Sequence, residues 1–294
     1  TTALAQAEEY GFLGKNILGS GFDFSIKLHR DIGIFVSGES SALMAAIEGI
    51  APEPRPKYIH TSVSGIRGRP SNLNNVETWA NVPLIISRGA EWFTGIGTEG
   101  SKGTKLVSLA GNITNTGVVE VPMGTTLERL IYDIGGGIPN GKKLKGVHIG
   151  GPLGGCIPES LLNLSVDFDE LTKAGAPMGA GSMIVIDEDT CMVDLARYFL
   201  NFVAEESCGK CVPCREGIYQ ILKILNRICE GNGKEGDIEL LEEISEVVRD
   251  ASLCALGQTA PNPVLSTIRY FRDEYEAHIK EKRCPAGVCK ALIS

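Results

Sequence analysis

The chain has 294 residues, of which 43% are hydrophobic and 22% charged, and it is long enough for two or three compact domains. Its formal net charge of −8 argues against nucleic acid as the main partner. No apolar run approaches the roughly 20 residues that a membrane span requires, so we expect no direct membrane insertion.

Nine cysteines stand out, and three of them lie within seven residues. Disulfide-rich secreted domains are usually much shorter, and the first residues of this chain lack the basic and then apolar pattern of a signal peptide. The clustering favours metal binding, and metal-ligating thiols favour a reducing compartment. We therefore expect a cytoplasmic protein.

Residues 1–100 have the pattern of an α/β layer. Residues 21–30 alternate apolar and polar side chains, which predicts a half-buried strand. Residues 33–49 indicate a second, buried strand, a Gly/Ser turn and a helix. Residues 51–70 are rich in Pro, Gly, Arg and Lys, and we expect a long loop there, of the kind that is often functional.

Two short runs in this block suggest ligand binding. The turn before the predicted helix contains Glu39 and offers free backbone N–H groups to an anion, with Ser37 or Ser40 as the helix cap. Such turns are common and most bind nothing, and the block has no G-x-G-x-x-G fingerprint. Further along, the amides of Asn74 and Asn75 suit the edge of a heterocycle, although helix capping by Asn is the simpler interpretation.

Residues 101–185 predict a small α+β domain of the ubiquitin-like, β-grasp kind. The pattern indicates a strand at 106–113, a strand at 117–122, a helix at 125–136 and a strand at 145–151. Two strands, a helix across them and further strands describe this fold.

Residues 186–283 are helical throughout by their pattern. Apolar residues recur at helical spacing in 187–207, 214–231, 236–253 and 262–282. Four amphipathic helices with short connections make a four-helix bundle.

The predicted bundle carries the most specific motif of the sequence. Cys208-x2-Cys211-x2-Cys214 places three thiolates in one short turn, and Cys254 follows beyond a helical hairpin. Structural zinc usually takes two separate Cys pairs, or a Cys pair with a His pair. A cubane takes three ligands from one compact loop and its fourth from a distant segment. The spacing therefore favours [4Fe–4S], with zinc and redox or core thiols as alternatives.

The remaining cysteines need separate interpretations. Cys191 and Cys229 fall in helical patterns, and we interpret both as small buried hydrophobes. Cys156 lies in a Gly-rich turn, and its role is open.

The tail, residues 284–294, contains a second candidate metal site. His278-x5-Cys284-x4-Cys289 could supply three ligands to zinc or iron. The fourth ligand would then come from a segment beyond this chain or from a partner. Solvent-exposed thiols near a chain end are the alternative interpretation.

Five segments, in order along nearly the whole chain, match one known family: GESSALMAAIEG, PRPKYIH, RGRPSNLNNVETWANVPLII, ESCGKCVPCREG and SLCALGQTAPNP. They resemble the NADH-binding flavoprotein subunit of respiratory complex I and its soluble relatives in NAD-linked hydrogenases, formate dehydrogenases and electron-bifurcating complexes. That family has a flavin domain, a β-grasp domain and a four-helix bundle that holds [4Fe–4S]. The resemblance therefore implies three parts, which are α/β, α+β and all-α.

By resemblance, a set of residues binds FMN and the nicotinamide nucleotide, NAD(H) or NADP(H). Gly38 and Glu39 would line the shared pocket, and Lys57 matches a basic position near the nucleotide. The four cluster cysteines match the family without exception. The full set of cofactor-binding positions is Gly38, Glu39, Ser40, Lys57, Asn74, Asn75, Thr78, Ala255 and Leu256.

Three departures from the family bear on function. The family's Gly-rich FMN loop lies upstream of where this chain begins, so the chain is either a fragment or receives that half of the site from elsewhere. The family usually has two consecutive glutamates where this chain has Glu39 and Ser40. Because the second carboxylate is absent, a ribose 2′-phosphate would be repelled less. His60 occupies a place where the family often has an aromatic residue that stacks on the nucleotide.

The resemblance implies an oxidoreductase subunit that passes a hydride from NAD(P)H to FMN and then single electrons to the cluster. No general acid or base stands out, so we predict no catalytic side chain. The expected partners are other iron–sulfur subunits, including a [2Fe–2S] ferredoxin-like subunit. The alternatives are a relay or scaffold that has lost flavin binding, and a zinc-stabilised interaction module.

Overall fold

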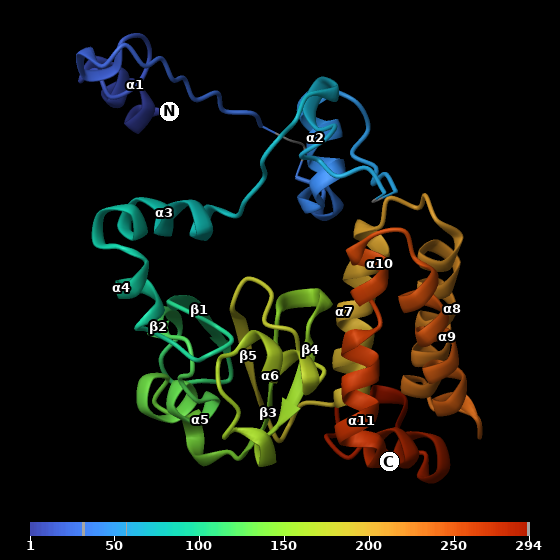
Figure 1. The fold of residues 1–294 in the computed structure, drawn as a ribbon. Coiled ribbons are helices and arrows are strands. Elements are labelled where there is room, and N and C mark those ends of the chain that lie inside the picture. The colour runs from blue at the N-terminus through green and yellow to red at the C-terminus, as the bar shows by residue number, and fades with distance from the viewer. Residues whose placement is uncertain (31–32, 57, 293–294) are drawn as a thin grey trace.

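The computed structural model describes residues 1–30, 33–56 and 58–292 (Figure 1). A five-stranded sheet and a group of packed helices lie side by side, and the first hundred residues extend along one end of both. In the described part of the chain, no helix combines the length and the apolar character needed to cross a bilayer.

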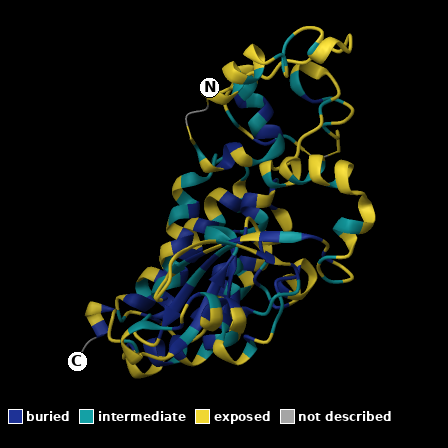
Figure 2. Ribbon diagram, turned by 90° about the vertical axis from the view of Figure 1, so that its left-hand side faces the viewer, coloured by how far each residue is buried: buried dark blue, intermediate teal, exposed yellow. Residues whose placement is uncertain are grey.

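Of the first hundred residues, those that the structure describes are largely exposed (Figure 2). No residue of α3 is buried, and apolar side chains such as Val76, which is 85% exposed, point to solvent. The helical elements of this part are α1 (Thr2–Glu9), η1 (Ile17–Gly19), η2 (Phe35–Gly38), α2 (Ser40–Glu48), η3 (Ile66–Gly68), α3 (Val76–Arg88) and α4 (Ala90–Thr94).

Two strands predicted in this part are wrong. Residues 21–30 run without regular secondary structure, and their one ladder contact is an isolated bridge between Gly14 and Phe24. Alternating side chains do not make a strand unless a neighbouring strand takes the backbone hydrogen bonds. The expected strand before α2 is instead the short 3-10 helix η2. Residues 51–56 and 58–70 form the expected loop, interrupted by η3.

The strands and helix predicted after residue 101 are present. The sheet order is β2-β1-β5-β3-β4, with β1 parallel to β5 and the other neighbours antiparallel. Its strands are β1 (Thr104–Gly111), β2 (Gly117–Pro122), β3 (Leu144–Ile149), β4 (Gly155–Pro158) and β5 (Ser182–Asp187). Its helical elements are α5 (Leu127–Arg129), the π-helical turn η4 (Leu130–Ile134), η5 (Pro139–Gly141), η6 (Gly151–Leu153), η7 (Glu159–Leu161) and α6 (Phe168–Lys173).

Buried and exposed side chains alternate along β1, and the buried ones form part of the core beside the sheet. Val107 and Leu109 are buried, whereas Leu106 between Lys105 and Val107 is half exposed. The buried face packs against Leu127 and Leu130 of the α5–η4 segment. The period of two in the sequence therefore places these side chains on opposite faces, as a pleated strand requires.

The four predicted long helices pack against one another around a second core. Helix α7 contacts α8 and α11, and α9 contacts α8 and α11, so the four close into a bundle (Figure 1). Leu200, Ile221, Leu225, Leu241 and Val264 are buried at its centre. The elements are α7 (Met192–Glu206), α8 (Val212–Cys229), α9 (Asp237–Ala251), α10 (Ala255–Thr259), α11 (Asn262–Glu276), the π-helical turn η8 (Ala277–Glu281) and η9 (Lys290–Leu292).

Helices α7 and α11 also pack on the sheet. The hydroxyl of Ser266 in α11 accepts a hydrogen bond from the backbone N–H of Cys156 in β4, at 3.0 Å. His148 of β3 stacks on Phe199 of α7, with ring centroids 3.9 Å apart. The sheet and the bundle are therefore joined by buried contacts.

Two neighbouring leucines of α9 test this core. Leu241 is fully buried and Leu240 is 39% exposed. Leu241→Ala should reduce the free energy of unfolding by about 2–5 kcal/mol because it leaves a cavity, and Leu240→Ala by less than about 1 kcal/mol. Denaturant unfolding of the metal-loaded protein measures both, and equal losses would mean that the bundle is packed differently.

Candidate metal centres and nucleotide site

Four thiols line one small cavity at the end of the bundle where α7 ends. Cys208 lies in the loop after α7, Cys211 is the N-cap of α8, and Cys214 is in the first turn of that helix. Cys254 is the N-cap of α10. The three cysteines of the motif and the remote cysteine therefore line one cavity, and Leu256 lies in its wall.

Hydrogen bonds to sulfur surround this first centre. The backbone N–H of Leu253 donates to Cys211 Sγ at 3.5 Å, and the N–H groups of Leu256 and Gly257 face Cys254. Burial raises the pKa of the Cys214 thiol to about 11. Buried and partly buried sulfurs with backbone donors suit an anionic iron–sulfur group, whose charge those donors stabilise.

The first part of the chain covers this centre. Val36 and Pro54 line the same cavity as the four thiols. The Lys210 ammonium donates to the carbonyl oxygen of Pro54 at 3.0 Å and lies 3.4 Å from the carboxylate of Glu53. Lys210 therefore holds the 51–70 loop against the thiol-bearing loop.

A second centre lies where α7 begins and α11 ends. The ligand atoms of Cys191, His278, Cys284 and Cys289 all lie within 4.8 Å of one another, and all four residues are buried. Among the described residues, no other group of three or more His, Cys, Asp or Glu side chains is close enough to share one ion. The alternative of solvent-exposed tail thiols is wrong, because both cysteines are in the core.

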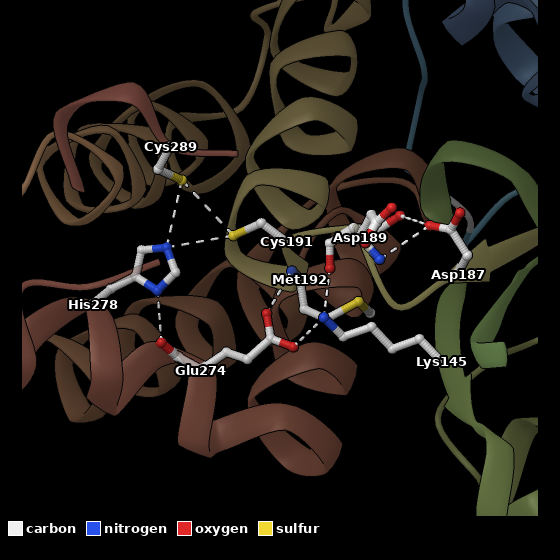
Figure 3. A network of polar contacts seen from close by, with 9 residues as sticks. Lys145, Asp187, Asp189, Cys191, Met192, Glu274, His278 and Cys289 are labelled. Carbon is white, nitrogen blue, oxygen red and sulfur yellow. Dashed lines mark hydrogen bonds and ion pairs between the residues drawn. The ribbon is translucent and has the colours of Figure 1, made fainter. Parts of the chain in front are cut away.

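The spacing of these atoms matches a tetrahedral ion. His278 Nε2 lies 3.4 Å from Cys191 Sγ and 3.4 Å from Cys289 Sγ, and the two sulfurs are 3.8 Å apart (Figure 3). Tetrahedral zinc with bonds of about 2.3 Å to sulfur and about 2.0 Å to nitrogen separates its ligands by about 3.5 Å for N and S, and by about 3.8 Å for two sulfurs. The donor set therefore fits one zinc-sized ion.

The fourth ligand position was missed by sequence reasoning. Cys191 is buried, as expected of a core thiol, but its sulfur faces His278, so the chain itself offers the fourth ligand. No segment beyond the chain and no partner is needed. Cys191 precedes His278 by 87 residues, and no local spacing signals a contact over that distance.

Glu39 and Ser40 line a hollow of about 240 Å³ together with Arg55 and His60. Burial and, to a smaller extent, the charge of Glu39 raise the pKa of the Cys254 thiol. The Glu39 carboxylate accepts hydrogen bonds from the N–H groups of Ser41 and Ala42, at 2.9 and 3.0 Å. Glu39 is thus the N-cap of α2, in place of the predicted Ser37 or Ser40.

The other predicted cofactor residues do not line this hollow. Asn74 and Asn75 line a separate hollow of about 810 Å³ along α3 and β1, whereas Thr78 is exposed outside its lining. Ala255 is exposed beside Cys254. Gly38 is the last residue of η2, directly before Glu39, and Lys57 lies outside the described residues.

Comparison with known proteins identifies two regions. Residues 194–278 match the family described as NADH-ubiquinone oxidoreductase-F iron-sulfur binding region. Residues 106–156 match the SLBB domain. All four thiols of the first centre fall within the iron–sulfur region, and Cys284 and Cys289 lie beyond it.

The chain is 50% identical over 292 residues to the NADP-reducing hydrogenase subunit HndC of Solidesulfovibrio fructosivorans. It is 44% identical over 283 residues to the second F-type subunit of NADH-quinone oxidoreductase in Rhizobium meliloti, and the match covers 96% of this chain and 67% of that protein. The chain belongs to the F-type family of NADH-quinone oxidoreductase subunits. The resemblance found in the sequence is thereby confirmed.

This member of the F-type family also matches a solved structure. It aligns with the crystal structure of NAD+-reducing [NiFe]-hydrogenase in the H2-reduced state with a TM-score of 0.80 and 32% identity, over 88% of this chain and 44% of that one. The match to HndC covers 99% of this chain and 60% of HndC. The chain therefore spans about three fifths of that relative's length.

The second centre of this F-type protein should bind metal more tightly as pH rises. A hydrogen bond with Cys289 and burial both raise the pKa of the Cys191 thiol, so an incoming ion has to displace a proton at neutral pH. Apparent zinc affinity, measured by competition with a chelator, should therefore rise between about pH 6 and about pH 8. Affinity that stays constant over this range would contradict thiolate ligation.

Proposed function

We propose that the chain passes electrons from a nicotinamide nucleotide, through FMN, to a [4Fe–4S] cluster held by Cys208, Cys211, Cys214 and Cys254. The observation that carries the proposal is the convergence of these four thiols on one cavity, inside the region that matches the family's iron–sulfur binding region. The relatives are named as NADH-quinone oxidoreductase and NADP-reducing hydrogenase subunits, which supports a nicotinamide nucleotide as the redox partner; the first name also supports it as electron donor.

The contrast between the two centres favours a cluster at the first. The ligand atoms of the second centre are close enough to share one ion, whereas the four thiols of the first are not grouped that tightly in the described chain. They nevertheless line the same cavity. A group of several irons, larger than one ion, suits this wider arrangement.

We assign the three sequence blocks to three domains. Residues 1–100 would be the C-terminal part of a flavin-binding domain, and residues 101–185 a β-grasp domain. Residues 186–283 would be the cluster-bearing bundle, followed by the tail, residues 284–294. The mixed sheet and the packed helices support the second and third assignments. Ligating thiols require reducing conditions, so we place the protein in the cytoplasm.

FMN would convert the two-electron donor into single electrons for the cluster. In the chain itself, Glu39 fixes the N-terminus of α2, and Ser40, Arg55 and His60 form the polar wall of the hollow that Glu39 also lines. Asn74 and Asn75 offer amides along α3. No side chain is required as a general acid or base, because a hydride moves without one.

The partners we propose are further iron–sulfur subunits, among them a [2Fe–2S] ferredoxin-like protein. A cluster that receives single electrons is useful only if another acceptor lies nearby. The relatives are named as subunits of an NADH-quinone oxidoreductase and of a hydrogenase, which supports an assembly of this kind.

A relay without flavin is the second candidate. One observation favours it: Asn74, Asn75 and Thr78 are all exposed, and the hollow along α3 is separate from the one that Glu39 lines. In that case the first centre would exchange electrons directly between partner subunits.

We propose that the second centre holds a structural zinc ion. Three thiolates and one imidazole close a tetrahedron, and a closed site has no open position for substrate. The match of the three measured separations to a tetrahedral ion supports zinc over a larger iron–sulfur group.

Metal, sulfide and flavin analysis of the purified protein under anaerobic conditions tests these assignments together. We expect about four irons with sulfide, and about one zinc, per chain. Cys254→Ser should abolish the visible absorbance of the cluster and leave the zinc, whereas Cys156→Ser, at a buried thiol of neither centre, should change neither content. Bleaching by NADH or NADPH supports the flavin route, and iron without flavin supports the relay. Zinc without iron would contradict electron transfer altogether.

Ser40 is predicted to permit NADP(H). It lies beside Arg55 in the same hollow, and a guanidinium suits a ribose 2′-phosphate. Ser40→Glu should lower activity with NADPH relative to NADH by about tenfold or more, because a second carboxylate repels the phosphate. Ser40→Ala, which removes the hydroxyl without adding charge, should change the ratio little. An NADPH to NADH ratio that stays the same in Ser40→Glu would count against this role.

A further inference from the structure

Glu274 of α11 forms hydrogen bonds to one ligand of the second centre, His278, and to the residue next to another, Cys191. Its backbone carbonyl oxygen accepts a hydrogen bond from His278 Nδ1 at 2.7 Å. This leaves Nε2 without a proton and facing Cys191 and Cys289, as a metal ligand requires. Its carboxylate accepts the backbone N–H of Met192, the residue after Cys191, at 3.0 Å (Figure 3).

Lys145 of β3 completes the arrangement from the sheet. Its ammonium lies 2.5 Å from the other carboxylate oxygen of Glu274, and only 16% of the Lys145 side chain is exposed. The same ammonium donates to the carbonyl oxygen of Thr190 at 2.5 Å. Thr190 and Met192 flank Cys191, so the Lys145–Glu274 pair holds the backbone on both sides of this ligand.

The ligands need such support because they come from unlike segments. Cys191 sits on the connection from β5 to α7, whereas His278 lies in the π-helical turn η8. Helix α11 is also irregular at Phe271, where φ is −137° and ψ is 36°. Neither segment by itself fixes the distance between the two ligands. The buried ion pair spans both and is itself satisfied by hydrogen bonds, which a buried charge requires.

We propose that Lys145 and Glu274 are positioning residues for the second metal centre. They hold Cys191 and His278 at ligand spacing, and they make retention of the ion depend on the packing of the sheet against α11. The inference rests on the zinc centre proposed above. It adds a link between the sheet, through Lys145 of β3, and helix α11, through Glu274, that the four ligands alone do not provide.

The test measures metal release from the full chain loaded with zinc, using a chromophoric chelator. Glu274→Ala should release zinc about 10–100-fold faster than the parent protein. Glu276→Ala is the matched control, because Glu276 lies on the same helix but is 43% exposed and pairs only with Arg272 and Lys280 among the described residues. It should change the rate less than about twofold.

Conservative variants separate positioning from general stability. Glu274→Gln keeps an oxygen for the N–H of Met192 and should restore slow release in part. Glu274→Ala also leaves a buried ammonium unpaired, which can prevent folding, so a Lys145→Met, Glu274→Met double variant serves as the second test. It should fold, keep the visible absorbance of the first centre and still release zinc faster.

Cobalt substitution gives a spectroscopic readout of the ligand geometry. In the double variant, the visible bands of the cobalt-loaded centre should shift or weaken, whereas those of Glu276→Ala should match the parent. Unchanged cobalt bands and unchanged zinc release in the double variant would overturn the proposal. The proposal would also be overturned if the double variant lowered the unfolding midpoint by the same amount in zinc-loaded and in zinc-stripped protein. If the parent chain binds no zinc, the zinc centre itself is wrong and this inference falls with it.

Discussion

The packing of α11 between the sheet and the other helices is the constraint on which the rest of the structure depends. Ser266 bonds β4 near the start of the helix, and Glu274 bonds β3 and the start of α7 near its end. The same helix contacts α7 and α9 of the bundle. Two hydrophobic cores are thereby fixed to each other, and both candidate metal centres are built on elements that this contact holds in place.

Helix α7 connects the two centres. Cys191 is its N-cap, and Cys208 follows two residues after its end. Its length, from Met192 to Glu206, corresponds to about 22 Å at about 1.5 Å per residue. The centres therefore lie at opposite ends of the bundle (Figure 1), and an ion at one end can stabilise the packing without approaching the four thiols at the other.

Local patterns in the sequence were enough for much of this fold. Helical periodicity predicted all four long helices, because their apolar faces pack in one core. The alternation of apolar and polar residues in 21–30 predicted a strand that does not form. A strand also needs a neighbouring strand, and a pattern within one segment carries no information about neighbours. The turn before α2 was predicted, but its cap was not: Ser37 and Ser40 are of the residue type that usually caps a helix, whereas in the fold Glu39 takes this position.

The two centres show that sequence spacing reveals ligands that lie close together in the chain but not those that are far apart. Cys208, Cys211 and Cys214 are separated by one short turn, so their spacing alone indicated a cluster. Cys191 has the burial of an ordinary core thiol, as does Cys229, whose thiol contacts Cys289 without joining the ligand group. Burial alone therefore cannot show that Cys191 joins the ligand group and Cys229 does not. The position of His278 Nε2, which faces Cys191, shows it. In the proposed zinc centre, His278 and three thiols would fill the four positions of a tetrahedral ion and leave none for a substrate. The proposed electron transfer would then belong to the four thiols at the opposite end of α7.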